Sequence, residues 1–206
     1  MIDVQGWFSW AERIPGPLNK TWPETNLMVG AVYHSAVGSL QGVIDTVMGP
    51  EEKSVTGVVG QDGRFVQFYP VTLSPWANGS HYANSHYLGF EFEGGAAGNE
   101  GEPLTDAQIN VGTRILADLA VYKNVSTEYW VRPTTLIEHR EIFPTACPSG
   151  RIPWQRIIDG LVVPPPSTQD VIYALVSAAQ FARLGYNFAD LSDEDKVALR
   201  WVVSGL

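Results

Sequence analysis

Short apolar runs recur through the first two thirds of the chain and predict a β-sheet. Four segments have the composition of strands: 26–34, 54–70, which contains two runs, 87–95 and 134–139. Asp62-Gly63 separates the two runs of the second segment, which is typical of a hairpin turn. The first segment ends on His34 and the last on His139, so each histidine should lie at the end of a strand.

Helical spacing appears between and after these runs. Residues 104–124 form the clearest predicted helix, because Thr105 and Gln108 have the spacing of a capping box. An apolar stripe follows at helical intervals: Ile115, Leu116, Leu119 and Tyr122. Residues 39–49 and 153–161 are also predicted to be helical. Together the segments predict an α/β fold, with a central mixed β-sheet and helices packed on it.

The end of the chain predicts a separate piece of structure. The run VVPPPS at 162–167 predicts a stiff polyproline connector, and two short helices are expected beyond it. We therefore expect one domain over 1–162 and a proline linker with a two-helix tail over 163–206. Two short helices rarely fold alone, so we expect the tail to be docked on the domain. A dimer contact and the start of a further binding module are the alternatives.

Charge and hydropathy exclude some partners. The chain has 13 Lys and Arg against 22 Asp and Glu, a net charge of −9, whereas nucleic-acid binding needs a basic surface. No apolar run reaches the roughly 18 residues of a membrane span. The first residues, MIDVQGWFSWAERIPG, lack the apolar stretch of a signal peptide, so we expect synthesis in the cytoplasm without ordinary secretion. Neither a nucleic acid nor a membrane is expected as a partner.

The single cysteine, Cys147, cannot form an internal disulfide, which leaves a packing role, a metal ligand or a nucleophile. If the strands that end on His34 and His139 are neighbours, both imidazoles emerge at one edge of the sheet. The loop after His139 could then return the thiol to the same place. Histidine nitrogen and cysteine sulfur are preferred zinc ligands, and catalytic zinc sites use three protein ligands. Burial as an apolar residue is the alternative for Cys147.

The order and content of these segments resemble the zinc-dependent N-acetylmuramoyl-L-alanine amidases, which include phage endolysin amidases, anhydromuramyl amidases and peptidoglycan recognition proteins. The resemblance covers roughly 26–161 and is most specific in LGFEFEGG and EHREIFPTACPSG. It implies zinc as cofactor, His34, His139 and Cys147 as ligands, and peptidoglycan or muropeptides as the partner. The reaction it implies is hydrolysis of the amide between N-acetylmuramic acid and L-alanine.

The resemblance also implies catalytic roles. Glu91 matches the general base of the family, and Glu93, on the same strand face, is the alternative. Thr145 falls where relatives carry a lysine or threonine that stabilises the oxyanion. A loop threonine that bonds its own backbone is the other interpretation of Thr145. Val55 stands where some relatives have a tyrosine near the metal, so that role is absent or filled from elsewhere.

The segment before the acidic strand departs from the family pattern. Many relatives have Trp-His-Ala-Gly, whereas this chain reads Trp-Ala-Asn-Gly at 76–79, and His81 or His86 could replace the missing histidine. Three residues here are expected to contact substrate: Trp76, Asn78 and Tyr87. Core packing is the alternative for the aromatic ones.

The sequence therefore favours a phage-type lysin, made in a host cytoplasm and acting on the cell wall. A cytoplasmic wall-recycling amidase fits the same residues. A muropeptide-binding module without activity is a further alternative, which the presence of Cys147 weakens. A structural or regulatory protein with a buried, unliganded cysteine is the last alternative.

Overall fold

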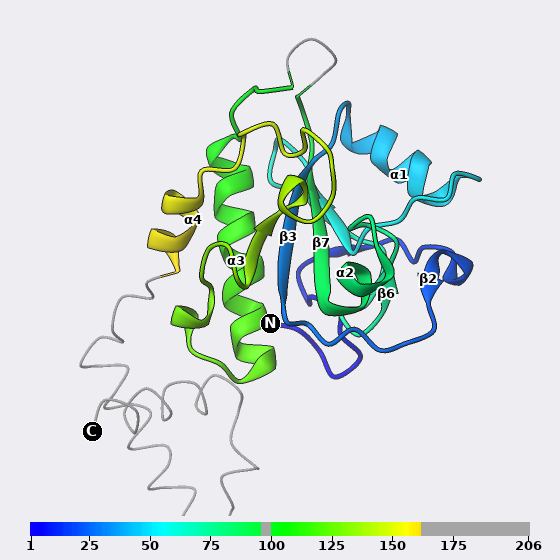
Figure 1. The fold of residues 1–206 in the computed structure, drawn as a ribbon, viewed down its shortest axis with the longest axis horizontal. Helices are drawn as coiled ribbons and strands as arrows, with labels where there is room; N and C mark the ends of the chain where they lie inside the picture. The colour runs from blue at the N-terminus through cyan, green and yellow to red at the C-terminus, as the bar shows by residue number, and fades with distance from the viewer. Residues whose placement is uncertain (96–99, 162–206) are drawn as a thin grey trace, which may run out of the picture. The chain divides into compact units, whose positions relative to one another are not determined.

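The computed structural model describes residues 1–95 and 100–161. A six-stranded sheet forms its centre (Figure 1). In pairing order its strands are β1 (Glu12–Arg13), β5 (Phe65–Gln67), β4 (Gly57–Val59), β7 (Tyr87–Phe92), β3 (Gly30–Ser35) and β8 (Leu136–Glu138). All pairs are parallel except the β4–β5 hairpin. A second, two-stranded sheet pairs β2 (Thr21–Trp22) with β6 (Ser74–Pro75).

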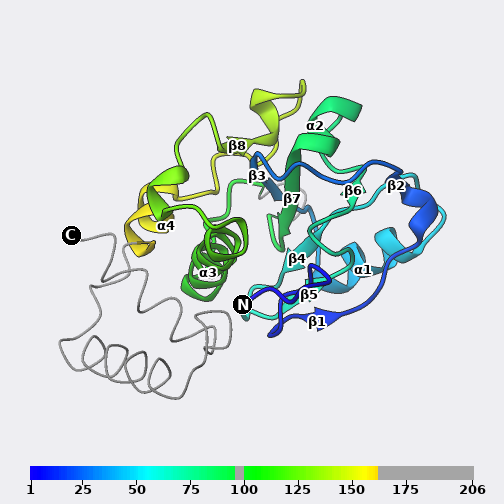
Figure 2. The same cartoon turned by 90° about the horizontal axis from the view of Figure 1, so that it is seen from below.

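Helices cover both faces of the main sheet (Figures 1 and 2). On one face α3 (Asp106–Lys123) and α4 (Trp154–Gly160) pack over a core that includes Tyr33, Phe92 and Leu116. On the other, α1 (Leu40–Met48) places Ile44 and Val47 in a smaller core with Val58 and Val66. The short α2 (His81–His86) precedes β7. Three 3-10 turns complete the described elements: η1 (Leu18–Lys20), η2 (Thr127–Tyr129) and η3 (His139–Glu141).

The structure confirms the α/β fold with a mixed central sheet. The predicted hairpin is β4–β5, and the capping box of Thr105 and Gln108 begins α3. Two boundaries are corrected, because the first predicted strand starts only at Gly30 and His139 begins η3 rather than ending β8. The predicted linker and tail lie outside the described residues.

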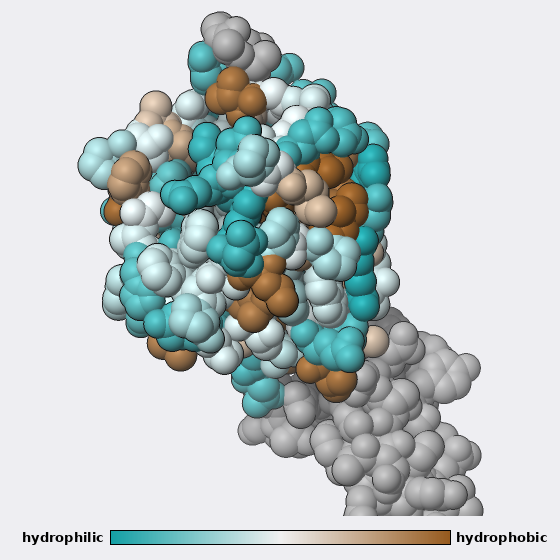
Figure 3. Space-filling model, turned by 90° about the vertical axis from the view of Figure 1, so that its right-hand side faces the viewer, coloured by the Kyte–Doolittle hydropathy of each residue, from teal (hydrophilic) through white to brown (hydrophobic). Residues whose placement is uncertain are grey.

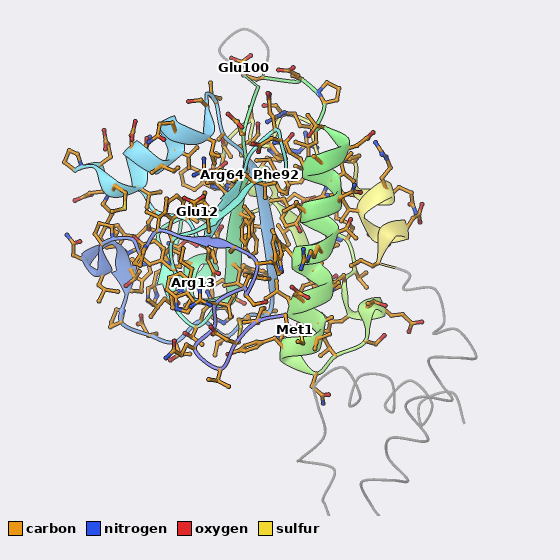
Figure 4. All side chains as sticks on the ribbon, turned by 180° about the vertical axis from the view of Figure 1, so that it is seen from behind. Met1, Glu12, Arg13, Arg64, Phe92 and Glu100 are labelled. Carbon is orange, nitrogen blue, oxygen red and sulfur yellow. The ribbon has the colours of Figure 1, made fainter. Side chains whose placement is uncertain are left out.

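The N-terminal residues, for which no element was predicted, attach to the edge of the sheet. β1 pairs with β5, and Arg64 after the hairpin turn forms a 2.6 Å ion pair with Glu12 of β1 (Figure 4).

Among the described residues, no helix is long and apolar enough to cross a membrane. On the face shown in Figure 3, apolar residues lie in separate small groups within a mostly hydrophilic surface.

Candidate active site

The site lies at the carboxyl ends of three neighbouring parallel strands. β3 lies between β7 and β8, and His34 of β3 is the register partner of Glu91 of β7. His139 follows directly after β8, so its ring lies beside that of His34, with the centroids 4.5 Å apart. The pairing of β3 with β8 thus brings together two histidines that are 105 positions apart in the sequence.

The loop after η3 returns Cys147 to this edge. The N–H of Arg140 donates to the carbonyl of Cys147 at 2.9 Å, and the N–H of Ser35 donates to its Sγ at 3.2 Å. Sγ lies 3.9 Å from Nδ1 of His34. The ligand-type atoms of His34, His139 and Cys147 all lie within 4.8 Å of one another. Among the described residues these three form the one such cluster of His, Cys, Asp and Glu side chains.

Asn78 fixes the orientation of the His34 ring. Its Oδ1 lies 2.9 Å from Nε2 of His34, while its Nδ2 donates to the carbonyls of Ala83 and Tyr87. Because both carbonyls can only accept, Oδ1 is the group that faces the imidazole, and Nε2 must carry the proton. The Nδ1 lone pair of His34 is then directed toward Cys147. Asn78 is fully buried, which corrects its expected role as a substrate contact.

The three side chains suit a metal ion. Burial and the neighbouring His139 lower the pKa of His34 to about 3, and burial lowers the pKa of His139 as well, so both rings are neutral near pH 7. Burial, with the charge of Glu91, raises the pKa of Cys147 to about 12. Nε2 of His139 is buried and has no hydrogen-bond partner. Two imidazole nitrogens and one cysteine sulfur are ligands that zinc prefers, and Nε2 of His139 has no other partner among the described residues.

Glu91 is the free carboxylate of the site. Its Oε2 is shielded from solvent and has no hydrogen-bond partner. Burial raises the pKa of Glu91 to about 7, although the charges of Arg151 and Lys53 each act to lower it. Glu93, the alternative base, is committed elsewhere: its two oxygens accept from the N–H groups of Leu40 and Gln61, each at 2.7 Å. The geometry therefore favours Glu91 as the group free to exchange a proton.

Arg151 was not among the predicted site residues. Its side chain is buried and donates to Ser35 Oγ at 2.6 Å and to the backbone carbonyls of Phe92, Glu93 and Glu102. These contacts hold its positive charge beside the carboxyl ends of β3 and β7. Its position four residues after Cys147, in CPSGRIPW, was the available signal, but an arginine in a loop has no distinctive spacing.

The remaining predicted residues lie outside the three-residue cluster of ligand candidates. The Thr145 hydroxyl accepts from the N–H of Cys147 at 3.2 Å, which is the local backbone bond considered for it. Trp76 is partly buried and packs against Trp22, with ring centroids 6.1 Å apart. Tyr87 is also partly buried, at the start of β7. Val55 is almost fully buried and lines a cavity with Glu91.

Neither histidine of α2 belongs to the cluster. His81 lies 3.0 Å from a Glu24 oxygen, and His86 stacks on Tyr82 with ring centroids 3.9 Å apart. The proposed replacement of the missing family histidine by one of them is therefore not seen. Asn78, within the altered Trp-Ala-Asn-Gly segment itself, is the residue that contacts His34.

Comparisons with known proteins agree with this arrangement. Residues 26–150 match the family described as N-acetylmuramoyl-L-alanine amidase. No curated protein matches the sequence. The crystal structure of a selenomethionine derivative of AmpD is similar, at 19% identity and a TM-score of 0.60, over 79% of this chain and 99% of that one.

Two further structures give comparable values. The N-acetylmuramoyl-L-alanine amidase LysC from Clostridium intestinale has 16% identity and a TM-score of 0.53, over 73% of this chain and 96% of its own. The catalytic domain of PlyG has 16% identity and a TM-score of 0.55, over 77% and 99%. At these identities the likeness shows a shared fold.

Proposed function

The chain belongs to the N-acetylmuramoyl-L-alanine amidase family, and from this premise we propose that its site is a zinc centre that hydrolyses peptidoglycan. The bond cleaved would join the lactyl group of N-acetylmuramic acid to L-alanine of the peptide arm. The observation that carries the proposal is the convergence of His34, His139 and Cys147 within 4.8 Å, beside an unpartnered Glu91 oxygen.

His34, His139 and Cys147 would hold the metal. When bound there, zinc would supply Lewis acidity, which polarises an amide carbonyl and lowers the pKa of water so that hydroxide is available as the nucleophile near neutral pH. The neutral imidazoles offer lone pairs without losing a proton, whereas the thiol must release one.

Glu91 would serve as the general base and then as the general acid. In the protein without metal, a pKa of about 7 leaves Glu91 ionised in half of the molecules at neutral pH, and the positive charge of a bound metal would favour the ionised form further. Glu91 could therefore take a proton from the attacking water. Once protonated, it can pass that proton to the departing amine of L-alanine. The guanidinium of Arg151, fixed by four acceptors, would stabilise the ionised state of Glu91.

Thr145 would stabilise the developing oxyanion. Its oxygen accepts from the Cys147 N–H, which leaves its O–H proton free to donate to substrate. A neutral hydroxyl contributes less to an anion than a lysine would.

We further propose a lytic role on intact cell walls, as for a phage endolysin made in a host cytoplasm. An endolysin amidase, LysCS from Clostridium intestinale, shares the fold at 15% identity and a TM-score of 0.53, and this supports the proposal. A wall-recycling amidase, which would use the same cluster of residues, is the second candidate. A binding module without activity is disfavoured, because all three metal-ligand candidates converge.

The test measures zinc content and the release of L-alanine amino groups from purified peptidoglycan. The wild-type protein should hold one zinc per chain and cleave, whereas Cys147→Ser and His139→Ala should lose both. His86→Ala, which removes a histidine outside the cluster, is the matched control and should retain both. Zinc without cleavage would indicate a binding module, and neither in folded protein would refute the proposal. Cleavage of soluble muropeptides but not intact walls would favour recycling.

A further inference from the structure

Lys53 differs from the other lysines and arginines in the described part of the chain. Within residues 1–95 and 100–161 every other lysine and arginine side chain has a hydrogen bond, an ion pair or an aromatic ring as partner. The ammonium group of Lys53 has none of these and is exposed. In a chain with a net charge of −9 and more acids than bases, such an unpaired cation is unusual.

Lys53 lines a cavity that also contains Glu91. The cavity has a volume of about 300 Å³, at the small end of the range for ligand sites. Val43, Thr46 and Val47 of α1 form one wall, and Val37 and Val55 add apolar surface. Lys53 is the one lysine or arginine in this lining, and Glu91 is the one acid. The cavity is therefore a small space of mixed polarity that reaches Glu91 and has one positive charge in its lining.

This chemistry suits a short peptide segment that carries a carboxylate. The valine side chains of the lining can contact a small side chain such as that of alanine, and an unpaired ammonium group favours a carboxylate by a charge-assisted hydrogen bond. The sugar arm of the substrate offers neutral hydroxyl and amide groups, which do not require a cation. The peptide arm is the part that can present carboxylates.

We propose that this cavity is the subsite for the peptide arm and that Lys53 selects arms with a free carboxylate next to the L-alanine. The inference rests on the proposed amidase function. Lys53 acts on substrate affinity, and its effect should disappear when the carboxylate is replaced by a carboxamide.

The experiment compares two synthetic substrates: N-acetylmuramoyl-L-alanyl-D-glutamate with its γ-carboxyl as the amide, and the same compound with both carboxyl groups as amides. Both are assayed with the wild-type protein, Lys53→Gln and Lys123→Gln. The last variant removes the same charge from a lysine that lies over the Tyr129 ring. Assays at pH 8.5 keep Glu91 ionised, so that a change in its protonation does not enter.

The wild type should prefer the acid substrate about tenfold in kcat/KM, through KM. Lys53→Gln should abolish that preference and leave cleavage of the amide substrate within about twofold, while Lys123→Gln matches the wild type. An equal loss on both substrates, or no loss on either, would overturn the subsite assignment while the amidase function stands. A wild-type protein that cleaves neither substrate nor peptidoglycan would refute the proposed function and this inference with it.

Discussion

The Asn78 carboxamide and the His34 imidazole form a 2.9 Å contact that determines which ring nitrogen faces the metal-ligand candidates. Asn78 is held by two hydrogen bonds that its side-chain amide donates and by a 2.6 Å bond from its backbone N–H to the side chain of Asn84. Gly89, which has no side chain, leaves room for it. A Cβ at Gly89 would lie 3.0 Å from the Asn78 Oδ1. The contact is therefore built into the packing between β7 and the segment before α2.

Asn78→Ala should weaken zinc binding about 10- to 100-fold, because the His34 ring loses the acceptor that holds its Nε2 proton. Asn78→Asp keeps an acceptor at that position and should recover part of the affinity. Zinc affinity is measured by competition with a chromophoric chelator, which does not depend on activity. Asn110→Ala, an exposed site on α3, is the control. Equal affinity in Asn78→Ala and the wild type would contradict the positioning role.

Cleavage should lose rate as Glu91 is protonated. Because the base must be ionised and its pKa is about 7 in the protein without metal, kcat/KM should fall about tenfold per pH unit on the acid side. Positive charge from a bound metal lowers a carboxyl pKa, so the bend should lie at or below pH 7 in the loaded enzyme. The measurement is a pH–rate profile with Glu91→Gln beside it. We expect the variant to be at least about 100-fold slower, and a wild-type bend well above pH 7 would exclude Glu91.

The carboxyl group of Glu91 should lower the free energy of unfolding when it is ionised. Its pKa is raised in the folded state from 4.5 to about 7, so the unfolding free energy decreases as pH rises through this interval and stays low above it. In metal-free protein, Glu91→Gln should therefore be more stable than the wild type at pH 8 by up to roughly 3 kcal/mol. At pH 4 the two should be alike.

Urea unfolding in the presence of a chelator gives both values. Glu93→Gln is the contrasting variant, since it disturbs two backbone-to-carboxylate bonds and should lose about 1–3 kcal/mol at pH 8. If Glu91→Gln were the less stable variant at pH 8, the burial argument for the Glu91 pKa would be wrong.

Lys20→Met should destabilise the protein by about 2–3 kcal/mol. Its buried Nζ donates to the carbonyls of Thr46, Val47 and Gly49 at the end of α1, and methionine leaves them without that donor. Guanidinium chloride unfolding measures the loss. Lys123→Met, which removes only a contact with the Tyr129 ring, should lose about 1 kcal/mol or less. Similar values for the two variants would show that the three carbonyl contacts of Lys20 contribute little.

The convergence of His34 and His139 could be predicted because it depends on a general rule, that neighbouring parallel strands end at one edge. The capping box of α3 was equally visible, since Thr105 and Gln108 are local in sequence. Asn78 was misinterpreted because its neighbours depend on α2, a six-residue helix without an apolar stripe. Its burial follows from packing between segments, which a single sequence does not display.

Arg151 and Lys53 illustrate the same limit. Arg151 is buried and donates to four acceptors, and Lys53 lines the cavity without a partner. Both lie in loops, where the sequence shows no regular spacing of apolar residues. Two-residue strands such as β1 are too short for periodicity to reveal them.

Both ends of α1 are held by side chains from outside the helix: Glu93 accepts the N–H of Leu40 at its start, and Lys20 holds the carbonyls at its end. The backbone of α1 is thus anchored independently of the residues on its cavity side. Gly42, Val43 and Thr46 can therefore be exchanged to alter which peptides fit while the helix keeps its place. This makes α1 the natural element in which to redesign substrate range, with the metal ligands left untouched.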